Sequence, residues 1–410
     1  MRVFTTLLTP AQAQARYRAA VPLRPLKTEP VALESALDRI LAADVVADGD
    51  LPSFDRSTVD GYAVRAAEVA GASEEEPVRL SVAGEVRMGE GTTLRVAQGG
   101  TVRIPTGGVL PEGADAVVMQ EHVRRNGEEA TVRRAVKPGE NLISRGEDVR
   151  RGEAVLSAGR RLRPADLGIL AGLGRTLVPV RLRPRVALLS SGDELVPPER
   201  SPGPGQLREM NAVALAALVR RAGGEPVVFP ILPDDLETVT GALRRAVAQS
   251  DVVVISGGSS VGERDVVVDA IAALGPPGII VHGVAIRPGK PTVLAAAGPR
   301  PVIGLPGNPV SALVIFAVFV HPVLAALLGA SEPARLPLGA RAGRALKAPP
   351  EREDHVRVRL ETRGDEVWAH PLPSKSGLLT SMLRADGIVV MAPGGRIAEG
   401  ESVAVELLDR

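Results

Sequence analysis

Short apolar runs alternate with longer stretches of helical spacing between residues 178 and 329. The runs have the length of buried strands, and the stretches between them have the length of ordinary helices. The expected strands lie at 185–189, 227–229, 252–255 and 279–281, and the expected helices at 211–221, 236–248 and 266–273. Strands that alternate with helices in this way predict βαβ units, and so a doubly wound, mostly parallel sheet with helices on both faces.

The pattern changes on both sides of this region. Residues 11–20 and 32–42 are rich in alanine and predict helices, and a helical pattern returns at 163–174. The segments 50–159 and 337–410 carry short strand-like runs separated by turn residues. We therefore expect an α/β plus β, multi-domain chain with the following parts: a helical or elongated linker (1–49 and 160–177), an inserted small β domain (50–159), the α/β domain (178–329) and a C-terminal β-barrel-like domain (330–410).

Residues 309–328 are almost entirely apolar and nearly long enough to span a bilayer. However, Asn308 and Pro309 are typical of a helix start, His321-Pro322 interrupts the run, and neither flank carries a cluster of charge. We expect a helix buried in the α/β core and no membrane partner.

Composition narrows the function classes without choosing one. A chain of 410 residues is too long for one ordinary core, which agrees with several domains. The net charge of +1 gives no sign of the basic surface that nucleic-acid-binding proteins carry. The absence of cysteine excludes disulfides, thiolate metal sites and cysteine nucleophiles. The start of the sequence lacks a long apolar stretch of the signal-peptide type, so we expect a cytoplasmic protein.

The loop 256–265 is the first candidate for chemistry. It follows the expected strand 252–255, and it combines three glycines with serines and the carboxylates Glu263 and Asp265. At the carboxyl end of a strand, such a loop exposes backbone N–H groups to anionic ligands, and its carboxylates can hold a divalent cation. Taken alone, the same residues are equally typical of a capped, glycine-rich turn.

Four more polar loops follow the other expected strands. They contain paired carboxylates at 193–194 and 234–235, two cations in the proline-rich loop 287–291, and a Gly/Pro-punctuated turn at 304–311. Because the carboxyl ends of parallel strands share one edge of a sheet, these loops are expected to converge. Together they would supply N–H donors, hydroxyls, carboxylates and cations for a phosphorylated ligand, a metal ion and a second oxyanion.

Several motifs resemble those of one family, the molybdenum insertases, which include the bacterial MoeA-type molybdopterin molybdenumtransferases and the gephyrin E domain. The motifs are Phe54-Asp55-Arg56-Ser57-Thr58-Val59-Asp60-Gly61-Tyr62-Ala63-Val64, Arg103-Ile104-Pro105-Thr106-Gly107-Gly108, Arg145-Gly146-Glu147-Asp148, Ser191-Gly192-Asp193-Glu194-Leu195, Ser256 to Asp265, Arg287-Pro288-Gly289-Lys290-Pro291 and Gly304 to Ser311. The resemblance covers essentially the whole chain in order.

The resemblance implies a Mg²⁺-dependent reaction in which adenylylated molybdopterin and molybdate, as substrates, give molybdenum cofactor and AMP. It also implies a homodimer that works with other proteins of this pathway. The residues it assigns to catalysis are Asp60, Thr106, Glu194, Asp234, Asp265 and Lys290. Those it assigns to substrate binding are Gly257, Gly258, Ser260, Arg287, Gly307, Asn308, Ser311, Arg357 and Ser376. Asp234 and Asp265 would hold the magnesium, and Asp60 and Thr106 would come from the other subunit.

Three positions depart from the family pattern. Arg287 replaces the usual first lysine of its loop, Ser259 replaces a valine, and Ser374-Lys375-Ser376-Gly377 lacks the glutamine or second serine often found there. Two other functions stay open at this point: a molybdopterin adenylyltransferase, which the α/β domain alone would suit, and a scaffold of the gephyrin kind. The residues do not separate molybdate from tungstate as the oxyanion.

Overall fold

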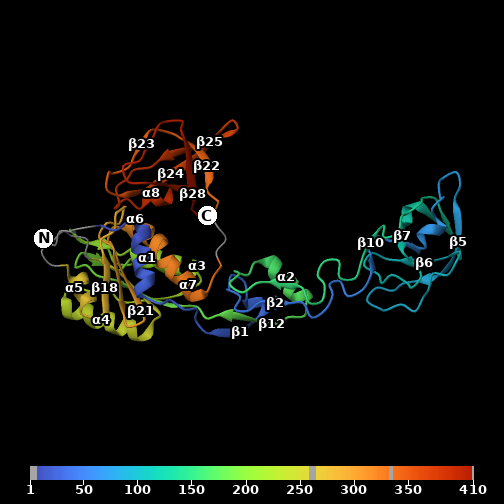
Figure 1. Ribbon diagram of the computed structural model, residues 1–410, viewed down its shortest axis with the longest axis horizontal. Helices are drawn as coiled ribbons and strands as arrows, with labels where there is room; N and C mark the ends of the chain where they lie inside the picture. The colour runs from blue at the N-terminus through green and yellow to red at the C-terminus, as the bar shows by residue number, and fades with distance from the viewer. Residues whose placement is uncertain (1–6, 258–264, 332–335, 409–410) are drawn as a thin grey trace.

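The computed structural model describes residues 7–257, 265–331 and 336–408. The molecule is elongated, as Figure 1 shows. The α/β region and the C-terminal β structure lie together at one end, and the inserted β domain lies at the other. A narrow neck, which contains β1 (Thr28–Ala32), β12 (Leu177–Arg181) and α2 (Pro164–Gly172), connects the two ends.

A six-stranded sheet in the order β16-β13-β17-β21-β20-β18 forms the centre of the α/β region. Its strands are β13 (Arg185–Ser190), β16 (Glu225–Val228), β17 (Val252–Ser256), β18 (Pro277–His282), β20 (Val293–Ala297) and β21 (Arg300–Leu305). The first four strands in the sheet order are parallel to one another, and β20 runs antiparallel to both β21 and β18. The predicted mostly parallel sheet is confirmed, as a mixed sheet with an antiparallel edge.

Side chains alternate between two apolar cores along each strand, as the pleat of a strand requires. Val252 and Val254 face one core, and Val253 and Ile255 face the other. The helices of the first core are α1 (Pro10–Ala20), α3 (Asn211–Arg221), α6 (Pro309–Ile315) and α7 (His321–Leu328), with a π-helical turn at Phe316–Val320 between the last two. The second core contains α4 (Leu236–Gln249) and α5 (Val266–Ala272).

The apolar segment 309–328 forms one long helix that packs in the first core, as expected. Among the described residues, it is the single helix long and apolar enough to cross a membrane. Helix α1 also packs in this core, where the Tyr17 hydroxyl donates to the Ala295 carbonyl at 2.9 Å. Although the expected boundaries put α1 in the linker, it lies on the α/β sheet; the boundaries themselves stay predictions.

The neck corrects one prediction, the helix at 32–42. The structure instead has β1, a 3-10 turn at Leu33–Ser35 and a left-handed residue, Asp38, with φ 61°. Strand β1 pairs antiparallel with β12, and β2 (Val45–Val46) pairs with β11 (Ala154–Leu156). The tertiary pairing overrides the helical propensity of the alanines, because propensity is worth only a few tenths of a kcal/mol per residue, roughly.

The inserted domain is a second six-stranded sheet, in the order β7-β4-β6-β5-β9-β8. Its strands are β4 (Gly61–Val64), β5 (Val78–Glu85), β6 (Gly100–Ile104), β7 (Ala116–Met119), β8 (Val123–Asn126) and β9 (Glu129–Val132). Two short strands, β3 (Arg56–Ser57) and β10 (Leu142–Ile143), pair where the chain enters and leaves the domain. The same pairing brings residue 57 beside the loop after β6, since Gly107 N–H donates to the Ser57 carbonyl at 2.7 Å.

The C-terminal region is a closed barrel, which confirms the predicted barrel-like domain. Its strands follow the order β24-β25-β22-β28-β26, and a further pairing of β24 with β26 closes the ring. They are β22 (Leu338–Ala342), β24 (Glu353–Arg363), β25 (Glu366–Pro371), β26 (Gly387–Met391) and β28 (Ser402–Leu407). Strand β19 (Ile286–Arg287), from the α/β region, pairs with the start of β24 and so joins the barrel to the central domain.

Candidate functional site

The five strands that precede the polar loops of the α/β domain end at one edge of its sheet, as the sequence predicted. Strands β13, β16, β17 and β21 are parallel, so their carboxyl ends share that edge. Strand β18 has the same direction as β21, because both run antiparallel to β20. The loop 283–292 that follows β18 therefore lies at this edge too.

The loops after β13 and β17 are in direct contact. Ser191 N–H donates to the Ser256 carbonyl at 2.9 Å. A Cβ atom on Gly257 would lie 2.6 Å from the Ser191 carbonyl oxygen, so this close approach requires glycine. The predicted Gly258 and Ser260, which continue this loop, lie outside the described residues.

Asp234 is held between two residues of the β13 loop. The Ser191 hydroxyl donates to the Asp234 carboxylate, and Asp234 N–H donates to Asp193 Oδ1 at 3.1 Å. Ser191 is buried, whereas Asp234 is exposed. The Glu194 carboxylate folds over Gly192, where a Cβ atom would lie 2.6 Å from Glu194 Oε2. The ends of β13 and β16 thus present a cluster of exposed carboxylates to one side.

Asp265 caps helix α5. Its Oδ1 accepts hydrogen bonds from Val267 N–H and Val268 N–H, both at 3.2 Å. The carboxyl group is half-buried, and this burial raises its pKa above the ordinary value although the two N–H groups act in the opposite direction. A carboxylate destabilised in this way gains from a nearby cation.

Sequence reasoning missed a buried polar cluster beneath this edge. The Ser190 hydroxyl donates to Glu209 Oε1 at 3.0 Å, and the Ser190 and Ser256 hydroxyls are 3.2 Å apart. Glu209 also accepts from Ala212 N–H, at 2.9 and 3.0 Å to its two oxygens, and it lines a cavity of about 420 Å³ beside α3. The sequence position of Glu209, just before the start of α3, could have predicted that it caps this helix. Its contact with Ser190 on β13 appears only in the folded structure.

The loop 283–292 carries Arg287 and Lys290, the two cations that the sequence predicted for the site. Arg287 forms a bidentate pair with Asp354 of the barrel, a residue that the sequence did not single out. Gly289 has a φ of 119°, and a Cβ atom there would meet Ile315 Cδ1 at 2.4 Å, so the loop packs tightly on α6. Lys290 is half-buried, and its carbonyl accepts from Val284 N–H at 2.9 Å.

The barrel contacts the start of α6 through the loop at 374–377. Val310 N–H donates to the Ser376 carbonyl at 3.1 Å, which places Ser376 beside Asn308, the residue at the N-cap position of α6. Gly307 accepts from Asn211 Nδ2 at 2.8 Å. Ser311, in the first turn of α6, is buried. The structure therefore brings the predicted residues at 307–311 and 376 together.

Arg357 lies on β24 and is 2% exposed, an unusual burial for an arginine. Its Nη2 donates to the Pro373 carbonyl at 2.7 Å, while its Nε has no hydrogen-bond partner within the described chain. Burial lowers the pKa of this guanidinium, and the nearby carboxylate of Asp354 partly offsets that effect. A buried cation with an unused donor favours an anionic ligand.

Asp60 and Thr106 meet in the inserted domain, away from the other predicted residues. Asp60 Oδ1 accepts from Thr106 N–H at 2.7 Å and from the Thr106 hydroxyl at 3.0 Å. These hydrogen bonds hold the pKa of the exposed Asp60 carboxyl below its ordinary value. Figure 1 shows β6 and β7 at the opposite end of the molecule from α5, so one chain does not bring Asp60 to Asp265.

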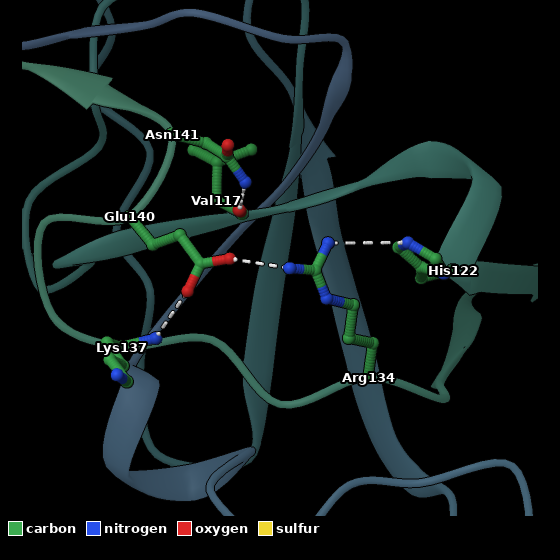
Figure 2. A network of polar contacts seen from close by, with 6 residues as sticks. All are labelled: Val117, His122, Arg134, Lys137, Glu140 and Asn141. Atoms are coloured by element: carbon green, nitrogen blue, oxygen red, sulfur yellow. Dashed lines mark hydrogen bonds and ion pairs between the residues drawn. The ribbon is translucent and has the colours of Figure 1, made fainter.

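A polar network supports the loop that carries Asp60 (Figure 2). Glu140 accepts from Arg134 Nη2 at 3.1 Å and from Lys137 N–H at 3.0 Å, as the dashed lines show. Asn141 Nδ2 donates to the Val117 carbonyl at 2.8 Å, while the Asn141 carbonyl accepts from Thr58 N–H at 2.9 Å. The network therefore ties residue 58 to β7.

The described residues contain no cluster of three or more His, Asp or Glu side chains able to hold a metal ion. Asp234 and Asp265 fit a different kind of cation site. Magnesium in proteins is commonly held by one or two carboxylates together with water and the phosphates of a substrate. The donor set at the sheet edge suits a cation that arrives with a phosphorylated ligand.

Three family models match consecutive parts of the chain. They are described as the MoeA N-terminal region (domain I and II), the Probable molybdopterin binding domain and the MoeA C-terminal region (domain IV), at residues 8–174, 187–326 and 339–408. These matches leave only short gaps between them. The three matches cover, in chain order, the inserted β domain with the neck, the α/β domain and the barrel.

Curated relatives and solved structures agree with this arrangement. Molybdopterin molybdenumtransferase of Haemophilus influenzae is 34% identical over 98% of this chain and 98% of its own length. The enzyme of the same name from Bacillus subtilis is 34% identical over 93% and 90%. The crystal structure of the molybdopterin biosynthesis MoeA protein from Pyrococcus horikoshii OT3 superposes with a TM-score of 0.84 at 31% identity, covering 98% of this chain and 100% of that one. The chain therefore belongs to the MoeA family of molybdopterin molybdenumtransferases.

Proposed function

We propose that this chain is a molybdenum insertase that transfers molybdenum from molybdate to adenylylated molybdopterin, with release of AMP and with Mg²⁺ as cofactor. Membership in the family supports the transfer of molybdenum. The observation that carries the finer proposal is the convergence of five polar loops at one sheet edge, with barrel residue Ser376 against the start of α6. That edge offers groups for two different anions, a phosphorylated ligand and an oxyanion.

The ligand and the oxyanion need different partners. The sequence pattern of the glycine-rich loop after β17, and the side-chain donors of Asn308 and Ser311 at the start of α6, suit the phosphates, because strand ends and polar donors of this kind bind anions. The buried Arg357, whose Nε is unused, and Lys290 suit the oxyanion, since both can carry positive charge. Gly257, Gly307, Asn308, Ser311 and Ser376 would line the space between these groups.

Asp234 and Asp265 would hold the magnesium, which when bound neutralises the charge of the pyrophosphate and polarises its P–O bonds. The raised pKa of Asp265 supports this role, because its half-buried charge is stabilised by a cation. Ser191 orients Asp234 through its hydrogen bond, and Val267 and Val268 orient Asp265. Glu194, at the same edge, is placed to act on a proton of the ligand or of a nearby water.

We propose that two copies of the chain form a homodimer in which each active site is shared. Asp60 and Thr106 lie at the far end of the elongated subunit, so a second copy would have to bring them to the sheet edge. A two-fold arrangement would create two equivalent composite sites. We also propose that the enzyme is cytoplasmic, where other enzymes of the same pathway would supply its substrate and take its product.

One assay tests the proposed reaction. The purified protein is incubated with adenylylated molybdopterin, Mg²⁺ and molybdate, and AMP release and cofactor formation are measured. Molybdate-dependent AMP release is the expected result. Adenylylation of molybdopterin from ATP would instead indicate an adenylyltransferase, and neither reaction, beside an active family member, would indicate a scaffold. Replacing molybdate with tungstate in the same assay determines the preferred oxyanion.

A further inference from the structure

A partly buried ion pair joins the C-terminal barrel to the loop 283–292. Arg287 Nε donates to Asp354 Oδ1 at 2.8 Å, and Arg287 Nη2 donates to the other carboxylate oxygen. The Asp354 side chain is only 5% exposed, and that of Arg287 is 37% exposed. A bidentate pair fixes the plane of the guanidinium, so both groups have a defined orientation.

Backbone pairing holds the same two segments together. Strand β19 pairs in parallel with the start of β24, where Ile286 lies opposite Glu353 and Arg287 lies opposite Asp354. Glu353 N–H donates to the Ala285 carbonyl at 2.9 Å. The segment that continues to Lys290 is therefore attached to the strand that continues to Arg357.

Asp354 influences two arginines but bonds to only one of them. Its charge acts on Arg357, three residues along β24, and so does the charge of Arg287. Both oxygens of Asp354 accept from Arg287, while Arg357 donates to the Pro373 carbonyl. Asp354 thus forms its hydrogen bonds with Arg287, and no carboxylate among the described residues forms a hydrogen bond with Arg357.

We infer that Arg287 is a positioning residue that acts through Asp354: the pair fixes the loop 283–292 against the barrel and so sets the spacing of Lys290 and Arg357. This inference rests on the proposed function, in which those two cations bind the oxyanion. It differs from the role in substrate binding that the sequence suggested for Arg287. In that alternative, Arg287 itself would bind the anion and Asp354 would compete for it.

The two roles predict opposite effects of Asp354→Asn on the KM for molybdate. If the pair positions the loop, Asp354→Asn and Arg287→Gln both raise this KM, by about tenfold, as expected for a lost charged hydrogen bond. The double variant is then no worse than the worse single variant. If Arg287 binds the oxyanion, Asp354→Asn releases it and lowers the KM, which would overturn the inference.

Arg287→Lys provides a conservative rescue. A lysine keeps the positive charge but can replace only part of the bidentate contact. We expect its KM for molybdate to lie between those of the wild type and Arg287→Gln. A KM for the lysine variant equal to that of the wild type would show that the bidentate geometry is not needed, against the inference.

Hydrogen exchange tests the attachment without using activity. Exchange at the Glu353 amide should become faster in Asp354→Asn and in Arg287→Gln, while the Ala342 amide, bonded to Glu401 at 2.9 Å in the same barrel, should not change. Arg341→Gln is the matched control, because it breaks an exposed arginine–glutamate pair with Glu366, Nε to Oε1 2.9 Å, in the same barrel. It should alter neither exchange at Glu353 nor the KM.

The two readouts keep the inference separate from the proposed function. A wild-type protein that transfers no molybdenum would refute the proposed function, and the exchange at Glu353 would still measure the attachment. Unchanged exchange at Glu353 in both Arg287→Gln and Asp354→Asn would refute the attachment, whatever the activity.

Discussion

Asp265 in the α/β domain and Asp60 in the inserted β domain are both assigned to one reaction, yet their surroundings shift their pKa values in opposite directions. Burial raises the pKa of Asp265, whereas hydrogen bonds from Thr106 lower that of the exposed Asp60. The α/β domain leaves the charge of Asp265 partly uncompensated. The β domain instead stabilises the charge of Asp60 by itself.

The difference extends to how the two sites are built. The α/β site is assembled from loops after five strands, with close approaches such as Gly257 against Ser191. The β-domain site consists of two adjacent loops, the one before β4 and the one after β6, and Thr106 on the second donates both hydrogen bonds to Asp60 on the first. We propose that the first site receives a cation and its ligand, and that the second presents a fixed anion.

Removing the charge of Asp265 should have the largest effect. Asp265→Asn should reduce turnover at least about 100-fold at low magnesium, because the charge stabilisation that a bound metal supplies is worth several kcal/mol, roughly. Asparagine still caps a helix well, so the Tm should change little. AMP release is measured against magnesium concentration, with circular dichroism as a check of folding.

Asp251→Asn is the matched control for Asp265→Asn. Asp251 precedes strand β17, at the opposite end from the loop that leads to Asp265. Its carboxylate accepts hydrogen bonds from Arg185 N–H at 2.9 Å and from Arg300 Nη1 at 2.7 Å. This variant should lose some stability and keep its magnesium dependence. Equal turnover of Asp265→Asn and wild type at low magnesium would contradict the role of Asp265.

The pH dependence of magnesium binding should reflect the same environment. Magnesium needs the ionised form of Asp265, and the raised pKa means that protons compete for it at higher pH than at an ordinary aspartate. As the pH is lowered, magnesium affinity should therefore begin to fall at a pH higher than that at which an ordinary aspartate is protonated. The affinity is measured by calorimetry with the ligand bound. If magnesium affinity stayed constant until the pH reached the range in which ordinary aspartates titrate, the pKa of Asp265 would not be raised and its environment would not differ from that of Asp60 in this way.

Crowding at the α/β loops predicts a smaller, structural effect. Gly289→Ala places a Cβ atom against Ile315 and holds an alanine at φ 119°, a backbone region that residues with a Cβ rarely adopt. We expect a loss of about 1–3 kcal/mol in the free energy of unfolding, the usual cost of overpacking. Gly298→Ala, at a turn with φ 55° and open space around its Cβ, should cost less. Equal losses in urea denaturation would show that the loop does not pack as described.

The smallest effect is expected at Asp60 itself. Thr106→Val removes the hydroxyl donor and keeps the backbone N–H, so the pKa of Asp60 should rise toward its ordinary value without reaching it. Because Asp60 stabilises the fold above its unfolded-state pKa, and this stability is lost as the pH falls through the lower folded-state pKa, Thr106→Val should shift that loss to higher pH. NMR titration of the Asp60 carboxyl measures the pKa, and Thr106→Ser, which keeps the hydroxyl, should leave it unchanged.

Much of the fold could be predicted from the sequence, because its pattern is strong. The apolar run 252–255 is long enough and β-branched enough to identify β17, and the helix–strand alternation around it fixes the sheet type. The helix expected at 32–42 is absent because its alanines carry only a weak preference, which the backbone contacts of Ala32, Leu41 and Ala42 with β12 override. Local propensity decides an element only where no partner strand competes for the backbone.

The site could be predicted only in part, for a similar reason. The order of strands and loops along the chain was enough to predict that the polar residues at 190–195, 234 and 287–291 follow strands that end at one edge of the sheet. Asp354 and Glu209 were not, since each becomes significant through a contact with a distant residue: Arg287 for the first, Ser190 for the second. Side chains that act through tertiary partners leave no local signal in the sequence.

In the proposed homodimer, Asp60 of one subunit and Asp265 of the other complete one active site. Inactive Asp60→Ala subunits are mixed with inactive Asp265→Asn subunits under conditions that allow exchange, and native mass measurement confirms the heterodimer. If the site is shared, one site of each heterodimer contains both wild-type residues, and AMP release returns to about half of the wild-type value per dimer, as two equivalent composite sites require. Confirmed exchange without any return of activity would contradict the shared site and confine Asp60 to its own chain.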